Sequence, residues 1–570
     1  MSENNAPGMR ALAWKQLRKS LSEIYRMRLL VTPIIRESFF LMGAWRPTEQ
    51  PHAAVAKRFA DVNRQFWEPA PSGKQNILIE GHLAEYGPNY LFRTGLAAKA
   101  IQSVIGGGDV VVVGNGFSYH WQIARECYRS FGITQWVFLS RKFILMTPFL
   151  ALVAGLRAAW SFFRLRTPLQ LLDLHHGGLK AGDLVYDEIL RGTKQPTIHS
   201  VNWTAYKAMA RSWYYYYQYH LLFSLKQYRY YIATHTAYSE YGLLCRVALQ
   251  RGVTVIETSD IQMSTYDSIG EKDLPTYHQG INAEIRADLN GGTGTVSARE
   301  ARARESLRRR LDSEIKQIDA QKAYSGKVYS REMLREALGI TSGSKIGFVA
   351  AHVFCDSPHL SSSMLHADYY LWLVETIDCC AEAHDMAWIV KPHPSCALYG
   401  EEGMVEALVL AKGASNIHMC PRDMNTSSLR DCADVILTVH GTVGLEYACL
   451  GIPTILAGTP FYAGFGFTHE PVSADAYNGM MRNAAALERL SAAQMSTALQ
   501  VFDAWECQFD WNNPIVTSAV LAQVWGNGVP RDIEKAYALL TQNLQDNNPR
   551  DLKLWHFARS VAAKGAAAHV

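Results

Sequence analysis

The chain has 570 residues, of which 48% are hydrophobic and 19% are charged, and its formal net charge is +4. This composition excludes a disordered, collagen-like or coiled-coil protein and supplies enough apolar material for large cores. The 56 basic residues nearly balance the 52 acidic ones, so no overall basicity indicates a nucleic-acid-binding protein, and we expect no nucleic acid as a partner.

The cysteines and the N-terminus bear on the compartment. None of the ten cysteines belongs to a CxxC pair, and a chain of this length needs no disulfides for stability, which favours a reducing, cytoplasmic environment. Residues 1–8 are polar, and no apolar segment with a small-residue cleavage site follows them. We therefore expect no signal peptide.

Residues 1–69 are predicted to form a helical N-terminal extension. Within it, residues 9–30 carry six basic residues against the single acid Glu23, with apolar residues between them. This pattern is typical of a helix lying on a membrane surface, and a helix packed on its own domain with a solvated basic face fits it as well. Residues 143–156 are uncharged but interrupted by Pro148. They are too short to span a bilayer, so we expect a buried or interfacial segment. The two stretches together suggest peripheral attachment to the inner membrane.

Short apolar runs alternate with helical stretches between residues 70 and 290. The expected strands are residues 76–80, 110–113, 135–139, 230–234 and 253–257. Strands that alternate with helices are typical of βαβ units around a parallel sheet. We therefore predict a first α/β domain over residues 70–290.

A charged segment follows this domain. Residues 290–295 (NGGTGT) break the alternating pattern, and residues 298–310 contain six arginines and two glutamates. A charged helix outside the cores is the simplest interpretation. We assign residues 291–340 to a helical connector.

Residues 341–485 are predicted to form a second, doubly wound α/β domain. Its expected strands are residues 345–350, 387–390, 417–419, 435–439 and 453–457. In such folds the ligand binds beyond the C-terminal ends of the strands, and each candidate loop of this domain follows a strand. The remaining residues, 486–570, are expected to be mostly helical.

The strongest candidate site follows the strand 435–439, where small residues open a helix. It runs through His440, Gly441, Thr442, Val443 and Gly444. Backbone N–H groups at a helix start favour an anion, and the Thr442 hydroxyl can donate to a phosphate. Glu446 lies one turn further along, where it can accept from sugar hydroxyls. An ordinary strand–helix turn with a glutamate on the helix face explains the same pattern.

Two other loops of the second domain carry candidate donor-binding residues. The sequence KPHP holds Lys391 and His393 between two prolines, which supplies a cation and an imidazole in a stiff loop. His393 is a candidate catalytic residue because an imidazole can protonate a departing phosphate or donate to it. His352, with Asp356 and His359, follows the strand 345–350. No fourth ligand completes a metal site, so we predict a donor-cleft role for His352 and no metal.

The first domain offers carboxylates as further catalytic candidates. Glu80 and Glu85 lie in the loop after its first strand, and Asp183 and Asp187 lie close together further along the chain. A carboxylate that faces the cleft can act as a general base or a nucleophile. We take Glu80, Glu85 and Asp187 as candidates, and the sequence leaves the choice among the carboxylates open.

The motifs of the second domain resemble a known family. KPHP, followed further along the chain by HGTVGLEYACLGIPTILAGTPFYAGFGFT, resembles the bacterial capsular polysaccharide glycosyltransferases, especially the Kdo-transferase group, and more distantly the bacterial sialyltransferases. The resemblance implies a GT-B-like α/β fold, in which two Rossmann-like doubly wound domains face a cleft, here with helical N- and C-terminal extensions. It places the acceptor on the first domain and the nucleotide-sugar donor on the second. Thr442 stands where these families usually have serine.

The resemblance also implies an activity. The protein would be a glycosyltransferase that moves a sugar, with Kdo from CMP-Kdo as the candidate, onto a growing capsular or lipopolysaccharide glycan or its lipid-linked primer. No cofactor is expected apart from the nucleotide-sugar substrate, for which a CMP-linked donor is favoured. Three alternatives stay open, namely a polymerase using CDP-linked polyol phosphates, a nucleotide-sugar epimerase, and a non-catalytic, membrane-associated assembly factor.

Overall fold

The computed structural model describes residues 51–567, apart from the short gaps 69–70, 72, 74, 85, 116–120, 268–276, 293, 315–317, 361–362 and 527–529. The predicted surface helix over residues 9–30 and the candidate Glu85 therefore lie outside the described residues. Of the N-terminal extension, the structure describes α2 (Ala53–Asn63) and the short helical turn that follows it.

The first sheet has six strands in the order β3-β2-β1-β6-β7-β8. Their bounds are β1 (Ile77–Glu80), β2 (Val110–Gly114), β3 (Gln135–Phe138), β6 (Tyr230–Ala233), β7 (Thr254–Thr258) and β8 (Met263–Tyr266). The first five are parallel, which confirms the predicted strands, whereas β8 pairs antiparallel with β7. The sequence did not reveal β8 or the hairpin of β4 (His175–His176) and β5 (Leu179–Lys180), because none of them is a continuous apolar run.

Helices cover both faces of this sheet. Side chains of β1 and β2 alternate between two cores, with Ile77 and Ile79 in one and Leu78 in the other. The helices of this part of the chain are α3 (Pro88–Ile105), α4 (Gln122–Ser130), α5 (Leu139–Lys142), α6 (Thr147–Phe162), α7 (Gly182–Thr193), α8 (Trp203–Leu225), α9 (Leu243–Gln250) and α10 (Tyr277–Asn290). Among the described residues, no helix has both the length and the hydrophobicity needed to cross a membrane.

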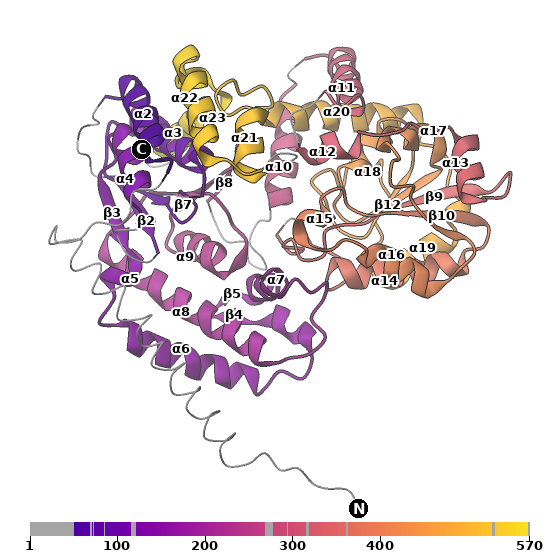
Figure 1. Ribbon diagram of the computed structural model, residues 1–570, viewed down its shortest axis with the longest axis horizontal. Coiled ribbons are helices and arrows are strands. Elements are labelled where there is room, and N and C mark those ends of the chain that lie inside the picture. Colours follow the sequence, from indigo (N-terminus) through magenta and orange to yellow (C-terminus); the bar gives the residue numbers. More distant parts are fainter. Residues whose placement is uncertain are drawn as a thin grey trace, which may run out of the picture.

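The second sheet has five parallel strands in the order β11-β10-β9-β12-β13. The strands are β9 (Lys345–Ala350), β10 (Met386–Lys391), β11 (Ile417–Met419), β12 (Val435–Thr438) and β13 (Thr454–Leu456). The helices of this domain are α14 (Tyr369–Glu382), α15 (Cys396–Tyr399), α16 (Met404–Lys412), α17 (Leu429–Cys432), α18 (Val443–Ala448) and α19 (Ala474–Arg482). When only the strands of each sheet are numbered, in chain order, both sheets begin 3-2-1-4-5, which is the Rossmann-like order. The predicted GT-B-like arrangement of two such domains is confirmed (Figure 1).

The connector packs more tightly than the sequence predicts. It contains α11 (Val296–Leu311), α12 (Ile318–Ala323) and α13 (Arg331–Leu338). Ala303 and Leu307 of α11 belong to a buried core shared with α20 (Ala492–Gln508), and Arg299 and Arg310 are buried as well. The expectation of a charged helix outside the cores is therefore wrong for α11, because its arginines pair with acids of neighbouring elements.

The last three helices return to the first domain. They are α21 (Ser518–Trp525), α22 (Ile533–Asp546) and α23 (Lys553–Ala567). Figure 1 shows these yellow helices beside α2 and α3, far from the second sheet. Val520, Leu540 and Trp555 are buried in the same core as β1 and β2. The end of the chain therefore completes the first domain and ties it to α20, which packs against α11.

Candidate functional site

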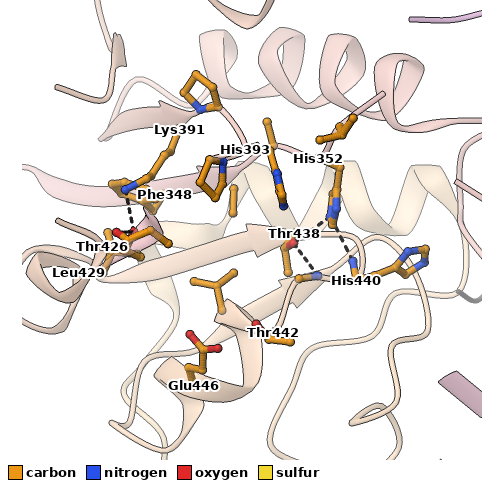
Figure 2. Close-up of a pocket in the computed structure, with 18 of the residues that line it drawn as sticks. Phe348, His352, Lys391, His393, Thr426, Leu429, Thr438, His440, Thr442 and Glu446 are labelled. Carbon is orange, nitrogen blue, oxygen red and sulfur yellow. Dashed lines mark hydrogen bonds between the residues drawn. The ribbon is translucent and has the colours of Figure 1, made fainter. Parts of the chain in front are cut away.

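A cavity of about 420 Å³ lies at the C-terminal edge of the second sheet. Its wall is formed by the loops after β9, β10 and β12, the start of α18, and parts of α10 and the connector. The predicted donor-binding residues that line it are His352, Lys391, His393, His440, Gly441, Thr442, Val443 and Glu446. Figure 2 shows how these side chains surround one space. The structure therefore brings the KPHP and HGT motifs together, as the strand order predicts.

Gly444 is the one predicted donor-binding residue that does not line the cavity. It is buried in α18, and a Cβ atom at this position would lie only 2.3 Å from the Tyr462 hydroxyl oxygen. That hydroxyl donates to the Gly441 carbonyl at 2.6 Å. Gly444 thus makes room for a side chain that holds the HGT turn in place.

Lys391 places a cation at one end of the cavity. Its Nζ donates to the Met424 carbonyl at 3.1 Å and to Thr426 Oγ1 at 2.7 Å (Figure 2). No carboxylate among the described residues acts on its charge, and burial lowers the pKa of Lys391 below its ordinary value. An ammonium group withdrawn from water with only neutral partners is costly. This end of the cavity therefore favours an anionic ligand.

His352 supports the HGT turn. Its Nε2 accepts from the backbone N–H groups of Val439 and His440, both at 3.3 Å, and lies 3.2 Å from Thr438 Oγ1. The ring stacks on Tyr369, with 4.4 Å between the centroids. Burial, together with the neighbouring His440, lowers the pKa of His352 well below its ordinary value. Because Nε2 accepts, the neutral ring carries its proton on Nδ1.

Two more histidines of the cavity are held neutral. His440 is buried, with its Nδ1 2.9 Å from the Tyr369 hydroxyl, and burial together with His278 lowers its pKa well below the ordinary value. His278, from α10, lies against it, and burial followed by the charge of His352 lowers the pKa of His278 to about 3. Gly458 allows this packing, since a Cβ there would lie 2.7 Å from His440 Nε2. These rings act as neutral hydrogen-bonding groups around the Lys391 cation.

His393 and Thr442 supply hydrogen-bond donors. His393 Nδ1 accepts from the Ser395 N–H at 3.2 Å, which leaves the proton of the neutral ring on Nε2. Thr442 occupies the N-cap position of α18, but its side chain makes no capping hydrogen bond. Both side chains line the cavity. An imidazole N–H and a hydroxyl therefore border the same space as the Lys391 ammonium.

Glu446 is tied to the connector. One of its carboxylate oxygens lies 2.6 Å from Arg310 Nε, and the other accepts a hydrogen bond from the Tyr324 hydroxyl. The side chains of Glu446 and Arg310 are each 3% exposed. This glutamate is therefore not a solvated charge on the first turn of a helix, as the simpler interpretation of the sequence predicts. It anchors α11 and the segment after α12 to the wall of the cavity.

Glu80 belongs to a buried cluster in the first domain. Its two oxygens accept from the backbone N–H groups of His82 at 2.6 Å and Thr234 at 3.2 Å. Burial opposes the charged form of His82, but the Glu80 carboxylate, 3.1 Å from its Nδ1, outweighs burial and raises the pKa of His82. Burial lowers the pKa of the nearby His235, against the opposing charges of Glu80 and Asp356. Asp356 lines the donor cavity, so charges of both domains act on His235.

Asp187 joins the two domains. It lies on α7, its Oδ1 is 2.5 Å from His359 Nδ1, and its Oδ2 accepts from the His359 backbone N–H at 3.2 Å. Its carboxylate is occupied by a residue of the second domain. Among the residues that the structure describes, no group of three or more His, Cys, Asp or Glu side chains could hold a metal ion.

Several cavity residues were not identified from the sequence. They are His278, Arg310, Tyr324 and Thr426. The arginine-rich run of the connector marks the segment that contains Arg310, yet nothing local separates this arginine from its neighbours, which are mostly exposed. His278 and Tyr324 stand in segments with no motif. Their place in the cavity depends on how α10 and the connector dock onto the second domain.

Comparison with known proteins supports the resemblance predicted from the motifs. Residues 377–502 match the family model of the capsule polysaccharide biosynthesis proteins. This segment runs from α14 into α20 and contains both KPHP and HGT. The resemblance to capsule polysaccharide proteins is thereby confirmed for this part of the chain. No curated protein sequence matches the chain significantly.

Solved structures with some similarity include two of KpsC from Thermosulfurimonas dismutans. The β-Kdo 2,4 transferase shows 16% identity and a TM-score of 0.31, covering 49% of this chain and 79% of that chain. The β-Kdo 2,7 transferase shows 16% identity and a TM-score of 0.30, covering 57% and 89%. A glycosyltransferase from Rickettsia africae shows 10% identity and a TM-score of 0.26, covering 83% and 100%. The fold described above follows from the strand order of the two sheets and not from these similarities.

Proposed function

We propose that this chain is a glycosyltransferase of surface-polysaccharide synthesis that binds a nucleotide-sugar donor in the cavity of the second domain. The observation that carries the proposal is Lys391, a partly buried ammonium that contacts only neutral oxygens. A donor phosphate would supply the missing negative charge, and charge-assisted hydrogen bonds of this kind are stronger than neutral ones. The family match of residues 377–502 supports the same class of activity.

The proposed roles within the cavity follow from the hydrogen-bond directions. Lys391 has a third N–H to give after Met424 and Thr426. His393 donates through Nε2, because its Nδ1 already accepts from Ser395. Thr442 can donate its hydroxyl, which does not cap α18. Together these donors would stabilise the charge that develops on the phosphate as the sugar leaves, which is electrostatic catalysis in a protected site.

Glu80 is the first-domain carboxylate that we propose for the reaction. Its side chain is buried and fixed by two backbone N–H groups, and Asp356 of the second domain acts electrostatically on the neighbouring His235. A fixed carboxylate there is suited to act as a general base on an acceptor hydroxyl or as a nucleophile. Asp187 is a weaker candidate, because His359 occupies both of its oxygens.

The finer parts of the assignment are proposals of the same kind. The donor is proposed to be CMP-linked, with CMP-Kdo as the candidate, and the acceptor a growing capsular or lipopolysaccharide glycan or its lipid-linked primer. The site of action is proposed to be the cytoplasmic side of the inner membrane. Residues 9–30, which the sequence suggests as a surface anchor, lie outside the described residues.

A thermal-shift panel of CMP, CDP, UDP, GDP and ADP tests the donor class. A ligand at one hundred times its dissociation constant stabilises the folded state by about 2.7 kcal/mol, so the correct nucleotide should raise Tm clearly. We expect CMP to give the largest shift and Lys391→Met to abolish it. Lys412→Met is the matched control, because Lys412 is an exposed lysine of the same domain paired with Asp378. Equal shifts for wild type and Lys391→Met would contradict the proposed phosphate site.

The same panel, followed by a transfer assay, separates the alternatives. Release of CMP with transfer of polyol phosphate from a CDP-linked donor would identify a polymerase. Turnover of a nucleotide sugar without any acceptor would identify an epimerase. Absence of a shift with every nucleotide would favour a non-catalytic assembly factor and overturn the proposal.

A further inference from the structure

Helix α6 (Thr147–Phe162) exposes its large apolar side chains. It lies along α8 at the edge of the first domain, away from the second domain (Figure 1). Between 60% and 75% of the surface of each of these side chains is exposed, namely Phe149, Leu152, Leu156, Trp160 and Phe163. Leu145, just before the helix, is 92% exposed. A single exposed leucine is ordinary, but a contiguous row of this size marks an interaction surface.

The spacing of these residues shows that they form one face. At 100° per residue, the five side chains from Phe149 to Phe163 fall within roughly 80° of arc. The opposite face holds the buried residues Leu150, Ala154 and Ala158, which contribute to contacts with α8. The helix therefore buries mainly small residues and exposes large ones, which is the reverse of a helix whose apolar stripe serves only its own core.

The charged residues of the segment that carries this face all have one sign. Residues 139–172 contain no aspartate or glutamate. The basic residues of this segment are exposed, namely Arg141, Lys142, Arg157, Arg164 and Arg166. The Arg164 guanidinium lies 3.8 Å above the centre of the Trp160 ring, so cation and aromatic ring stand at the same edge of the apolar row. An apolar row with a basic border complements a surface of anionic headgroups over acyl chains.

The length of α6 decides how it would meet such a surface. Its 16 residues span about 24 Å at 1.5 Å per residue, which is less than the hydrocarbon core of a bilayer, about 30 Å. Its inner face also packs against α8. The helix can therefore lie in the plane of the interface but cannot cross it. Trp203, 64% exposed at the start of α8 and stacked on Tyr206, adds an aromatic ring of the kind enriched at membrane interfaces.

We propose that the outward face of α6 is a docking surface for an anionic lipid bilayer. The face is defined by Leu145, Phe149, Leu152, Leu156, Trp160 and Phe163. It belongs to the first domain, whereas the donor cavity belongs to the second, so this inference stands whether or not the proposed glycosyl transfer is correct. It lies in the second of the two stretches that the sequence marks for a membrane surface, apart from residues 9–30, and the structure adds which side chains form the face.

Vesicle flotation of the full-length chain tests the proposal. The probes are vesicles of phosphatidylcholine alone and of phosphatidylcholine with one-quarter phosphatidylglycerol. We expect wild type to bind the anionic vesicles more strongly, and binding to weaken in high salt, because salt screens the basic border. Leu152→Glu combined with Leu156→Glu should reduce partitioning into anionic vesicles at least tenfold.

A matched control separates this face from apolar exposure in general. Leu410 is 83% exposed on α16 of the second domain, so Leu410→Glu places a glutamate at a still more exposed leucine and should leave binding unchanged. Leu152→Glu alone is the charge-matched partner of this control. Nucleotide thermal shifts of each variant report whether the second domain is intact, and Leu152→Ser with Leu156→Ser replaces the double glutamate if that variant fails to fold.

Three results would overturn the proposal. Wild type could fail to bind either vesicle, or the α6 variants could bind as strongly as wild type, which would place the contact elsewhere in the chain. Alternatively, wild type could be an oligomer in solution that the α6 substitutions dissociate, with no vesicle binding, which would make the face a contact between copies of this chain.

Discussion

The two sheets share the strand order 3-2-1-4-5, but the charges withdrawn from water beside them differ in whether they have a counter-ion. In the first domain two acids withdrawn from water have arginine partners, with Arg246 2.5 Å from Asp183 and Arg93 3.0 Å from Asp260. At the edge of the second sheet, the Lys391 ammonium contacts only neutral oxygens. The histidines His278, His352 and His440 around the same cavity have lowered pKa values and stay neutral.

This difference distinguishes residues that stabilise the fold from residues that bind a ligand. A charge that the protein itself compensates contributes to folding, whereas a buried charge left without a counter-ion is a cost that a ligand of opposite charge can remove. The second domain carries its own exception in Glu446, whose charge is compensated by Arg310. We therefore predict that removing a paired cation from the first domain lowers stability, whereas removing Lys391 from the second domain lowers ligand affinity.

The largest expected effect is the loss of Arg246. Arg246→Met leaves the buried Asp183 carboxylate without its cation and should reduce the free energy of unfolding by about 3–5 kcal/mol, measured by urea denaturation. Asp183→Asn combined with Arg246→Met should recover part of the loss. A loss below about 1 kcal/mol would show that the pair is screened by solvent, which would weaken the contrast between the domains.

Lys391→Met should have the opposite effect, lowering ligand affinity while leaving stability almost unchanged. The free energy of unfolding should stay close to that of wild type, because the substitution removes a buried ammonium that has no counter-ion. Donor-nucleotide affinity should fall about ten- to a hundredfold, since a hydrogen bond to a charged group contributes roughly 1.5–3 kcal/mol. Calorimetric titration measures the affinity. Unchanged affinity together with a large loss of stability would make Lys391 a structural residue.

Glu446→Gln distinguishes an anchor from a donor ligand. The substitution removes the carboxylate that pairs with the buried Arg310, so we expect a loss of about 1.5–3 kcal/mol in the free energy of unfolding and less than a threefold change in donor affinity. Urea denaturation and calorimetric titration measure the two quantities. If affinity instead falls tenfold or more at unchanged stability, Glu446 accepts hydrogen bonds from donor hydroxyls, as the sequence suggests.

The smallest expected effect is a pH dependence of the second domain. The folded-state pKa of His278, about 3, lies below its ordinary value of 6.5. As the pH falls below 6.5, His278 therefore becomes protonated in the unfolded chain but stays neutral in the folded chain. The free energy of unfolding is therefore higher above this pH and falls on acidification, by about 1 kcal/mol between pH 7 and pH 5.5 for one such histidine. Urea denaturation of His278→Gln at both pH values should show this part of the loss removed. The exposed His384 provides the control, and an equal effect of His384→Gln would contradict the assignment.

Local patterns were sufficient for most of the fold. The strands of both parallel sheets are short continuous apolar runs, and such runs are recognisable because both faces of a parallel sheet are buried. The loops with KPHP and HGT could be placed at one edge because parallel strands end on the same side. β8 escaped prediction because its four residues, Met263–Tyr266, neither form an apolar run nor alternate polar and apolar side chains, and its antiparallel pairing depends on a neighbouring strand.

The sequence by itself thus determined the two α/β domains and the position of the motifs, because hydrophobic periodicity and turn residues act over a few neighbouring positions. Only the tertiary structure decided which charges are compensated. Glu446 meets Arg310 from 136 residues away, and Asp187 meets His359 from 172 residues away. The exposure of the α6 face was equally hidden, since an apolar helix reads the same whether its large side chains face a core or the surroundings. Pairing and burial depend on how distant elements dock, and no local pattern encodes that.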